Sequence, residues 1–292
     1  LESGDGHYCH YNLVLGQNKG YSGLMKIVLA TPIYPPEIGG PAIYIKELCA
    51  RIKTEYRITV VAYTDVRTPF PGTKLIAVSK RRPLIIRLIK FFMAIWQASA
   101  KADLIYVQNA MAAGLPVALV SLLKRKPFIV KFVGDEAWER ATQLRRTNLR
   151  LEEFLRQPEG GLRTKFMMMI QGFVLRRASI VTTPSAYLKD EIIRAYKLNS
   201  NKARVNYNAA EEPQILPFET TRQRYQIATT ARLVAWKGID GIIRALSQVR
   251  KRFPTATLVV AGDGPEMANL KNLVAKLHLQ EAVQFLGNVS RA

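Results

Sequence analysis

A loop at residues 231–238 combines two cations with the setting of a phosphate site. Its sequence, Ala-Arg-Leu-Val-Ala-Trp-Lys-Gly, follows a strand-like run at 225–230 and opens a helix-like run at 239–252. Arg232 offers a planar fork of donors, and Lys237 adds a mobile point charge five residues later. The helix start adds unpaired N–H groups and the positive end of its dipole. The loop therefore predicts a phosphate site, and it suits a diphosphate that must leave with its negative charge stabilised.

A glycine pair, Gly39-Gly40, ends the loop that follows an expected strand at 26–30. Glycine permits a close approach between backbone and ligand, and Pro41 is well placed at the start of the next helix. The alternative is an ordinary strand-to-helix turn.

A second glycine-containing turn at 262–266 follows an expected strand at 257–261. It either faces a nucleotide or makes a tight strand-to-helix connection. The residues that would face the ligand are Gly262, Gly264 and Glu266. Neither this turn nor the glycine pair is the Gly-x-Gly-x-x-Gly dinucleotide fingerprint, and its absence from the chain excludes a nicotinamide dehydrogenase of that type.

Two acids, Asp135 and Glu136, follow the expected strand at 128–133. Carboxylates at the carboxyl end of a parallel strand lie where α/β proteins bind ligands, so Asp135 is a candidate for acceptor positioning or proton uptake. The alternative is that Asp135 caps the N-terminus of a helix, a frequent use of aspartate.

Short apolar strands alternate with longer helical segments from Met25 onward, a pattern that predicts βαβ units and a parallel sheet. A proline- and glutamate-rich stretch without periodicity interrupts the alternation and is interpreted as a linker. The sequence therefore predicts an α/β protein of two Rossmann-like domains, the second incomplete. The predicted parts are a disordered or non-native leader at 1–24, a first domain at 25–207, the linker at 208–222 and a partial second domain at 223–292.

The chain of 292 residues carries a formal net charge of +21, which favours an anionic partner such as nucleic acid, anionic lipid or a phosphorylated substrate. Its hydrophobic share of 48% excludes a disordered protein. Two cysteines suggest no disulfide framework and favour a reducing, cytoplasmic location. The helix expected at 83–100 has a broad apolar face behind the basic triplet 80–82, which fits either an interfacial membrane helix or a core helix.

The order and spacing of these motifs resemble the retaining glycosyltransferases of family 4, which have the two-Rossmann-domain architecture called GT-B. The resemblance spans residues 25–292 and rests on Gly39-Gly40, the loop 231–238, the segment 259–266 (Val-Val-Ala-Gly-Asp-Gly-Pro-Glu) and Phe-Leu-Gly-Asn-Val at 285–289. The activity it implies is transfer of a sugar from a nucleotide-diphosphate sugar to an acceptor hydroxyl, with retention.

The resemblance also implies roles for individual residues. Arg232 and Lys237 would contact the donor diphosphate as catalytic cations, and the turn 262–266 would lie near the nucleoside. Gly39 and Gly40 would approach the donor phosphate or the acceptor. The leaving diphosphate would be neutralised by protein cations and helix dipoles, with neither a metal ion nor a cofactor.

Two departures from the family pattern stand out. Many relatives have a histidine at the end of the strand that matches 128–133, where this chain has Gly134-Asp135. The family's Glu-x7-Glu segment, which supplies donor-sugar contacts, is expected beyond Val289, and the chain ends at Ala292. The missing segment predicts a truncated chain with little or no activity.

The expected partners are a nucleotide sugar, a lipid-linked or saccharide acceptor and an anionic membrane surface. The expected setting is cell-surface polysaccharide, lipopolysaccharide or glycolipid synthesis, in the cytoplasm or peripherally at the inner face of the plasma membrane. The alternative is a non-catalytic basic α/β module that binds nucleic acid. The charge supports that alternative, but no recognised nucleic-acid motif does.

Overall fold

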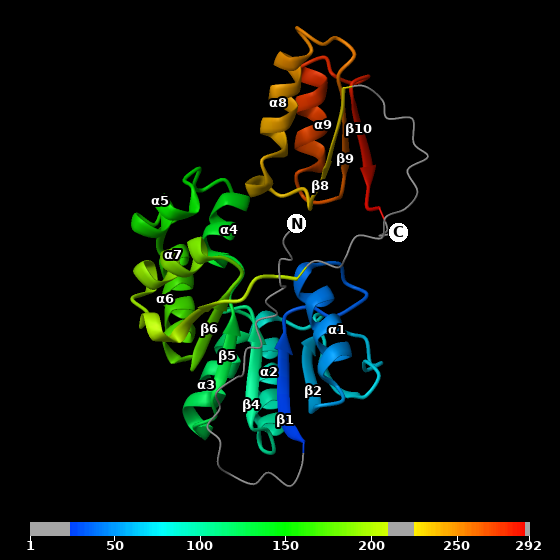
Figure 1. The fold of residues 1–292 in the computed structure, drawn as a ribbon. Coiled ribbons are helices and arrows are strands. Elements are labelled where there is room, and N and C mark those ends of the chain that lie inside the picture. Colours follow the sequence, from blue (N-terminus) through cyan, green and yellow to red (C-terminus); the bar gives the residue numbers. More distant parts are fainter. Residues whose placement is uncertain (1–23, 210–224, 290–292) are drawn as a thin grey trace, which may run out of the picture.

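The chain folds into two lobes, each built on its own parallel sheet (Figure 1). The computed structural model describes residues 24–209, here the first lobe, and residues 225–289, the second lobe. The first sheet has the order β3-β2-β1-β4-β5-β6-β7 and the second the order β10-β9-β8. Every strand pair is parallel, and the run β3-β2-β1-β4-β5-β6 is the strand order of doubly wound dinucleotide-binding folds. The predicted α/β class with two Rossmann-like units is confirmed.

Most elements of the first lobe are short strands followed by helices. The strands are β1 (Met25–Thr31), β2 (Tyr56–Tyr63), β3 (Thr73–Val78), β4 (Leu104–Gln108), β5 (Phe128–Lys131), β6 (Ile180–Thr183) and β7 (Ala203–Val205). The helices are α1 (Gly40–Ile52), α2 (Leu84–Ser99), α3 (Gly114–Lys124), α4 (Glu136–Gln143), α5 (Leu151–Arg156), α6 (Gly161–Arg177) and α7 (Ala186–Tyr196), with a 3-10 turn η1 (Ser200–Lys202).

The second lobe repeats the same unit on a smaller scale. Its elements are β8 (Gln226–Thr230), the 3-10 turn η2 (Ala235–Lys237), α8 (Ile239–Val249), β9 (Thr257–Ala261), α9 (Met267–Lys276) and β10 (Val283–Gly287). The apolar residues of α8 and α9 pack on β9 in a core around Ile243, Leu258 and Leu270.

The first sheet has a separate core on each face. One core joins β1 and β2 to α1 through Ile45 and Cys49. The other is larger and packs α2, α3 and α6 on the sheet through Phe91, Val117 and Val174. Both faces of β1 are therefore buried, which explains its continuous apolar sequence and its place at the centre of the sheet.

The strands expected around residues 26–30, 58–63, 104–108 and 180–183 are present, and the helix expected at 83–100 is α2. The sequence interpretation missed β3 and did not resolve α4, α5 and α6. The strand expected at 128–133 ends at Lys131, and a short segment then leads to α4, which begins at Glu136.

The predicted leader and linker lie almost wholly outside the described residues, so the predicted domain limits stay a prediction. Among the described helices, none is both long and apolar enough to cross a membrane.

Candidate active site

The loop 231–238 and the turn 262–266 form one interlocked backbone structure at the carboxyl ends of β8 and β9. The Leu233 N–H donates to the Asp263 carbonyl at 3.0 Å, and the Glu266 N–H donates to the Leu233 carbonyl at 3.1 Å. Leu233 itself is buried in the core of the second lobe. The structure thus brings together the two second-lobe motifs that the sequence singled out. Both the N–H and the carbonyl of Leu233 bind the turn, so the turn holds the loop in place.

Close backbone contact explains both glycines of the turn. A Cβ on Gly262 would lie 1.9 Å from the Ala231 carbonyl oxygen, and one on Gly264 would lie 2.3 Å from the Leu233 carbonyl oxygen. Gly262 also has φ of +138°, which side chains rarely adopt. These glycines make the tight connection that was one of the two sequence interpretations, and their contact with a nucleotide stays a prediction.

Arg232 and Lys237 are exposed on this braced loop. Arg232 precedes the buried Leu233, and Lys237 ends η2. The next residue, Gly238, has φ of +66° and turns the chain into α8. Two cations and a helix N-terminus are therefore combined on a backbone that hydrogen bonds to the turn 262–266 hold in place.

An acid from the first lobe, Glu139 of α4, lies close enough to these two cations for their charges to act on its carboxyl. Burial raises the pKa of Glu139, the charge of Asp135 raises it further, and the charges of Lys237 and Arg232 oppose the rise. Its carboxylate occupies the space beside Gly134, where a Cβ would lie 2.3 Å from Oε1. The sequence interpretation missed Glu139, because a helical acid shows no sign in the sequence of which distant element it faces.

Helix α4 is also where the two lobes touch (Figure 1). The Trp138 ring of α4 and the Trp236 ring of η2 lie 6.3 Å apart between centroids. The Glu266 carboxylate accepts from Gln143 Nε2 at 3.3 Å and pairs with Arg145 at 3.5 Å. Glu266, predicted as a donor-binding residue, therefore has its carboxylate engaged by the first lobe, and its contact with a donor stays a prediction.

Asp135 is the N-cap of α4, as the alternative interpretation held. Its carboxylate accepts from the Trp138 N–H at 2.9 Å and from Gln171 Nε2 at 3.2 Å, and it also accepts from the Tyr196 hydroxyl. The residue is 0% exposed, and burial raises the pKa of its carboxyl. A catalytic role for Asp135 stays a prediction, and in this conformation the carboxylate has no exposed surface for a substrate.

Gly39 and Gly40 lie at the start of α1, at the carboxyl end of β1. The Gly39 carbonyl accepts from the Ala42 N–H at 3.1 Å, and Pro41 occupies the first turn of the helix. A Cβ on Gly40 would meet nothing within 4 Å, so packing does not require glycine there. Among the described residues, this pair makes no hydrogen bond with Arg232 or Lys237, and its role at the donor or acceptor stays a prediction.

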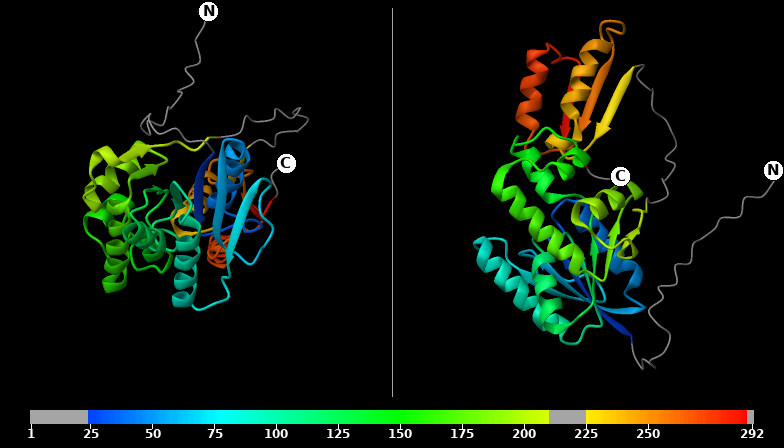
Figure 2. Two further views of the ribbon diagram at one scale, coloured as in Figure 1. Left: turned by 90° about the horizontal axis from the view of Figure 1, so that it is seen from below. Right: turned by 90° about the vertical axis from the view of Figure 1, so that its left-hand side faces the viewer.

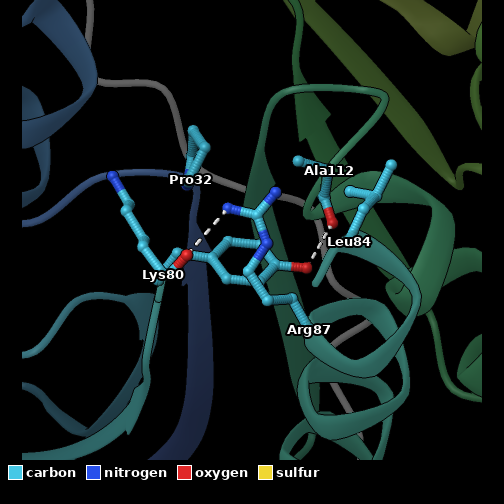
Figure 3. Close-up of a pocket in the computed structure, with 6 residues that line it drawn as sticks. Pro32, Lys80, Leu84, Arg87 and Ala112 are labelled. Carbon is cyan, nitrogen blue, oxygen red and sulfur yellow. Dashed lines mark hydrogen bonds between the residues drawn. The ribbon is translucent and has the colours of Figure 1, made fainter. Parts of the chain in front are cut away.

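A cavity of about 220 Å³ opens at the same edge of the first sheet (Figure 3). Its lining residues are Pro32, Tyr63, Lys80, Leu84, Arg87 and Ala112. Arg87 Nη1 donates to the Lys80 carbonyl at 3.4 Å, while its buried Nε has no partner among the described residues. The sequence pattern of the helix expected at 83–100 gave no sign that Arg87 lines a cavity.

A buried lysine, Lys131, is the last residue of β5, at the carboxyl edge of the first sheet. Its Nζ donates to Asn208 Oδ1 at 2.8 Å and lies 3.9 Å from the centre of the Tyr44 ring. Burial lowers its pKa. Lys131 thus ties the sheet to the segment that leaves the first lobe.

Within the described residues, no group of three or more His, Cys, Asp or Glu side chains could hold a metal ion.

Two family models together span nearly all of the structure described above. Residues 38–211 match the model of Glycosyltransferase Family 4, and residues 213–292 match that of Glycosyl transferases group 1. The chain belongs to Glycosyltransferase Family 4. The predicted family membership is confirmed, together with the two-lobed architecture.

Individual relatives are distant. The gpi3 subunit of phosphatidylinositol N-acetylglucosaminyltransferase from Schizosaccharomyces pombe is 33% identical over 103 residues, which cover 35% of this chain and 22% of that protein. An uncharacterized glycosyltransferase of Methanocaldococcus jannaschii is 26% identical over 220 residues, covering 71% of this chain and 49% of that protein. This chain therefore matches less than half the length of either relative.

The fold is also that of a solved structure, HepE of Anabaena in complex with UDP. The TM-score is 0.64 at 20% sequence identity, covering 91% of this chain and 70% of HepE. At that identity, the likeness supports the fold.

Proposed function

We propose that this family 4 chain belongs to an enzyme that moves a sugar from a nucleotide-diphosphate sugar to an acceptor hydroxyl with retention at the anomeric carbon. The observation that carries the proposal is the interlocked loop with Arg232 and Lys237. It presents two exposed cations beside a helix N-terminus, on a backbone bonded to the turn 262–266.

Arg232 and Lys237 act on the charge that builds on the leaving diphosphate. The bond between the anomeric carbon and the diphosphate oxygen breaks, so negative charge on that oxygen grows toward the transition state. Cations held in position stabilise this charge more than they stabilise the ground state, which lowers the barrier. The bonds of Leu233 to the turn keep the loop from having to reorganise during the reaction.

Glu139, which comes from the opposite lobe, interacts electrostatically with the two cations that bind the donor diphosphate. A donor diphosphate takes over the interaction with Lys237 and Arg232, and the site exchanges one anion for another. Because burial raises the pKa of Glu139, its carboxyl takes up a proton more readily than an exposed glutamate when a second anion arrives.

The acceptor binds on the first lobe, at the carboxyl edge of its sheet. Gly39 and Gly40 approach it from the start of α1, and the cavity beside Arg87 offers it a basic, partly apolar surface. The acceptor is a lipid-linked molecule or a saccharide, and the pathway is the synthesis of cell-surface polysaccharide or glycolipid, including lipopolysaccharide. We place this activity in the cytoplasm, at the inner face of the plasma membrane.

The test replaces Arg232 by alanine and measures binding of UDP and GDP. Transfer from the corresponding sugars is measured for the same substitution in a version of the protein that carries a full second domain. Loss of one charge-assisted contact should weaken nucleotide binding by about tenfold and cut turnover by about a hundredfold. Arg244→Ala, an exposed arginine on α8 away from the loop, is the matched control. Equal binding and turnover in the two variants would remove Arg232 from the site.

Nuclear magnetic resonance of the anomeric carbon in the product tests whether its configuration is retained.

Nucleic-acid binding is the rival outcome of the same experiment. Salt-dependent binding of oligonucleotides, combined with no binding of either nucleotide diphosphate, would replace the transferase proposal with the basic-module alternative.

A further inference from the structure

Helix α2 is apolar on its outer side as well as on its inner side. Phe91, Ala94 and Ile95 are buried against the sheet. On the opposite side, Ile85, Ile89 and Met93 recur every four residues and are 71%, 54% and 55% exposed. A helix that is apolar all round is normally covered on all sides, so the outer row of α2 has the composition of a face that meets a partner.

The neighbouring helix α3 extends this apolar surface. Leu119, Leu122 and Leu123 are exposed on its outer side, while Val117 and Val120 are buried. The two helices pack against each other. They also meet at their C-terminal ends, where Lys124 Nζ lies 4.2 Å from the centre of the Trp96 ring. The α2–α3 face is defined here by Ile85, Ile89, Met93, Trp96, Leu119, Leu122 and Leu123.

Basic residues outnumber acids along the segment that carries the α2–α3 face, although Lys80 pairs with Glu37 and Arg81 pairs with Asp65, two acids outside that segment. From Lys80 to Lys131 the chain has ten Lys and Arg residues and one acid, Asp103. The Asp103 carboxylate accepts from the Lys26 backbone N–H, so it lies at the N-terminal end of β1. Arg82, Lys90 and Arg125 are exposed at the start, middle and end of the face. Apolar area and positive charge therefore coincide.

We propose that the α2–α3 face docks on an anionic lipid bilayer. The isoleucines and leucines would enter the boundary between headgroups and acyl chains, while Lys90 and Arg125 would contact lipid phosphates. Trp96, with an apolar ring and a polar N–H, suits the headgroup level. A second copy of the chain fits less well, because two such faces would bring like charges together.

Docking of this face would place the acceptor cavity at the membrane. Leu84 and Arg87 of the first turn of α2 line that cavity, and the next residue after Leu84 is Ile85 of the docking face (Figure 3). A lipid-linked acceptor could then reach the cavity without leaving the bilayer. This last step rests on the proposed function; the docking itself does not.

The first test is co-sedimentation with vesicles of phosphatidylcholine alone or mixed with phosphatidylglycerol, without donor or acceptor. The protein should bind the mixed vesicles and be released by salt. Ile85→Ser with Ile89→Ser should weaken binding by about tenfold or more, because buried apolar area is lost. The matched control is Val249→Ser with Leu286→Ser, two exposed apolar residues of the second lobe.

The second test removes charge. Lys90→Gln with Arg125→Gln should weaken binding to the mixed vesicles by about tenfold or more, since each cation near an anionic surface contributes about fivefold. Lys251→Gln with Arg252→Gln on the second lobe is the control, and should change binding little. Circular dichroism confirms that each variant is folded.

Equal binding of the wild-type protein to both kinds of vesicle would overturn the proposal. So would an equal loss of vesicle binding in the α2–α3 variants and in the control variants of the second lobe. So would a wild-type dimer in light scattering that the Ile85→Ser and Ile89→Ser variant loses. Nucleotide binding through Arg232 is measured without vesicles, so a failure of the transferase proposal is distinguishable from a failure of the docking proposal.

Discussion

Glu139 is the residue that distinguishes this site from a simple pair of cations. Arg232 and Lys237 could be predicted from the sequence because their spacing and their place between a strand and a helix are local features. Glu139 could not, since it approaches from another lobe. Asp135 shows the converse limit: the sequence marks it as an acid at a strand end, but only tertiary packing reveals that Gln171 and Tyr196 enclose it.

We predict that Glu139→Gln tightens the binding of UDP or GDP. The substitution keeps the side-chain shape and removes one negative charge that competes with the diphosphate for Lys237 and Arg232. The expected gain is about three- to tenfold in affinity, near 1 kcal/mol, because the two cations are exposed and screened. Titration calorimetry at low salt measures it. Glu281→Gln, an exposed acid elsewhere on the second lobe, serves as control, and equal affinities in the two variants would contradict the role assigned to Glu139.

At the scale of elements, periodicity predicted those strands and helices that have a single clear apolar face. The edge strand β3 is only partly buried along most of its length, so its alternation is weak. Helix α6 begins at two glycines and has apolar residues on several sides, as the run 167–170 shows, so no helical face stands out. Both elements are specified by their neighbours more than by their own sequence pattern.

Helix α4 combines a favourable electrostatic position with an unfavourable degree of burial. Its first turn carries Glu136 and Glu139 behind the N-cap Asp135, where negative charge interacts well with the helix dipole. Burial nevertheless raises the pKa of Glu136 from 4.5 to about 7, while a hydrogen bond from Asn109 opposes the rise. Well below pH 4.5 the carboxyl is protonated in both the folded and the unfolded chain. As the pH rises toward 7, the unfolded chain releases this proton while the folded chain keeps it, so the free energy of unfolding falls.

The wild-type protein should therefore lose stability relative to Glu136→Gln between pH 4.5 and about 7, and the difference should then stay constant. The full difference is on the order of 3 kcal/mol, less any hydrogen bond that glutamine fails to make. Urea unfolding of both proteins at acidic and at mildly alkaline pH measures it. Glu55→Gln, at an exposed acid before β2, should show no comparable change. A pH-independent gap between wild type and Glu136→Gln would show that the Glu136 carboxyl is not desolvated.

At the scale of the whole molecule, the two sheets could be predicted from the restart of the strand–helix alternation, but the way the lobes meet could not. The two lobes meet where α4 contacts η2 of the second lobe, and Figure 2 shows the two lobes from two further sides. The polar part of the contact depends on Glu266, which the sequence suggested as a ligand contact. The Glu266 backbone N–H binds the Arg232 loop, and the Glu266 carboxylate binds the first lobe. One residue therefore contacts both the loop and the opposite lobe.

We predict that Glu266→Ala loosens the contact between the lobes without unfolding either. Gln143 and Arg145 lose their shared acceptor, but the Arg145 side chain is 68% exposed, so the ion pair contributes only about 0.2–1 kcal/mol. The population with separated lobes should rise by about two- to fivefold. In a Trp96→Phe background, the remaining Trp138 and Trp236 face each other across the contact and report on it. Acrylamide should quench their fluorescence more strongly in Glu266→Ala than in Glu281→Ala. Equal quenching would mean that the aromatic pair holds the lobes together without Glu266.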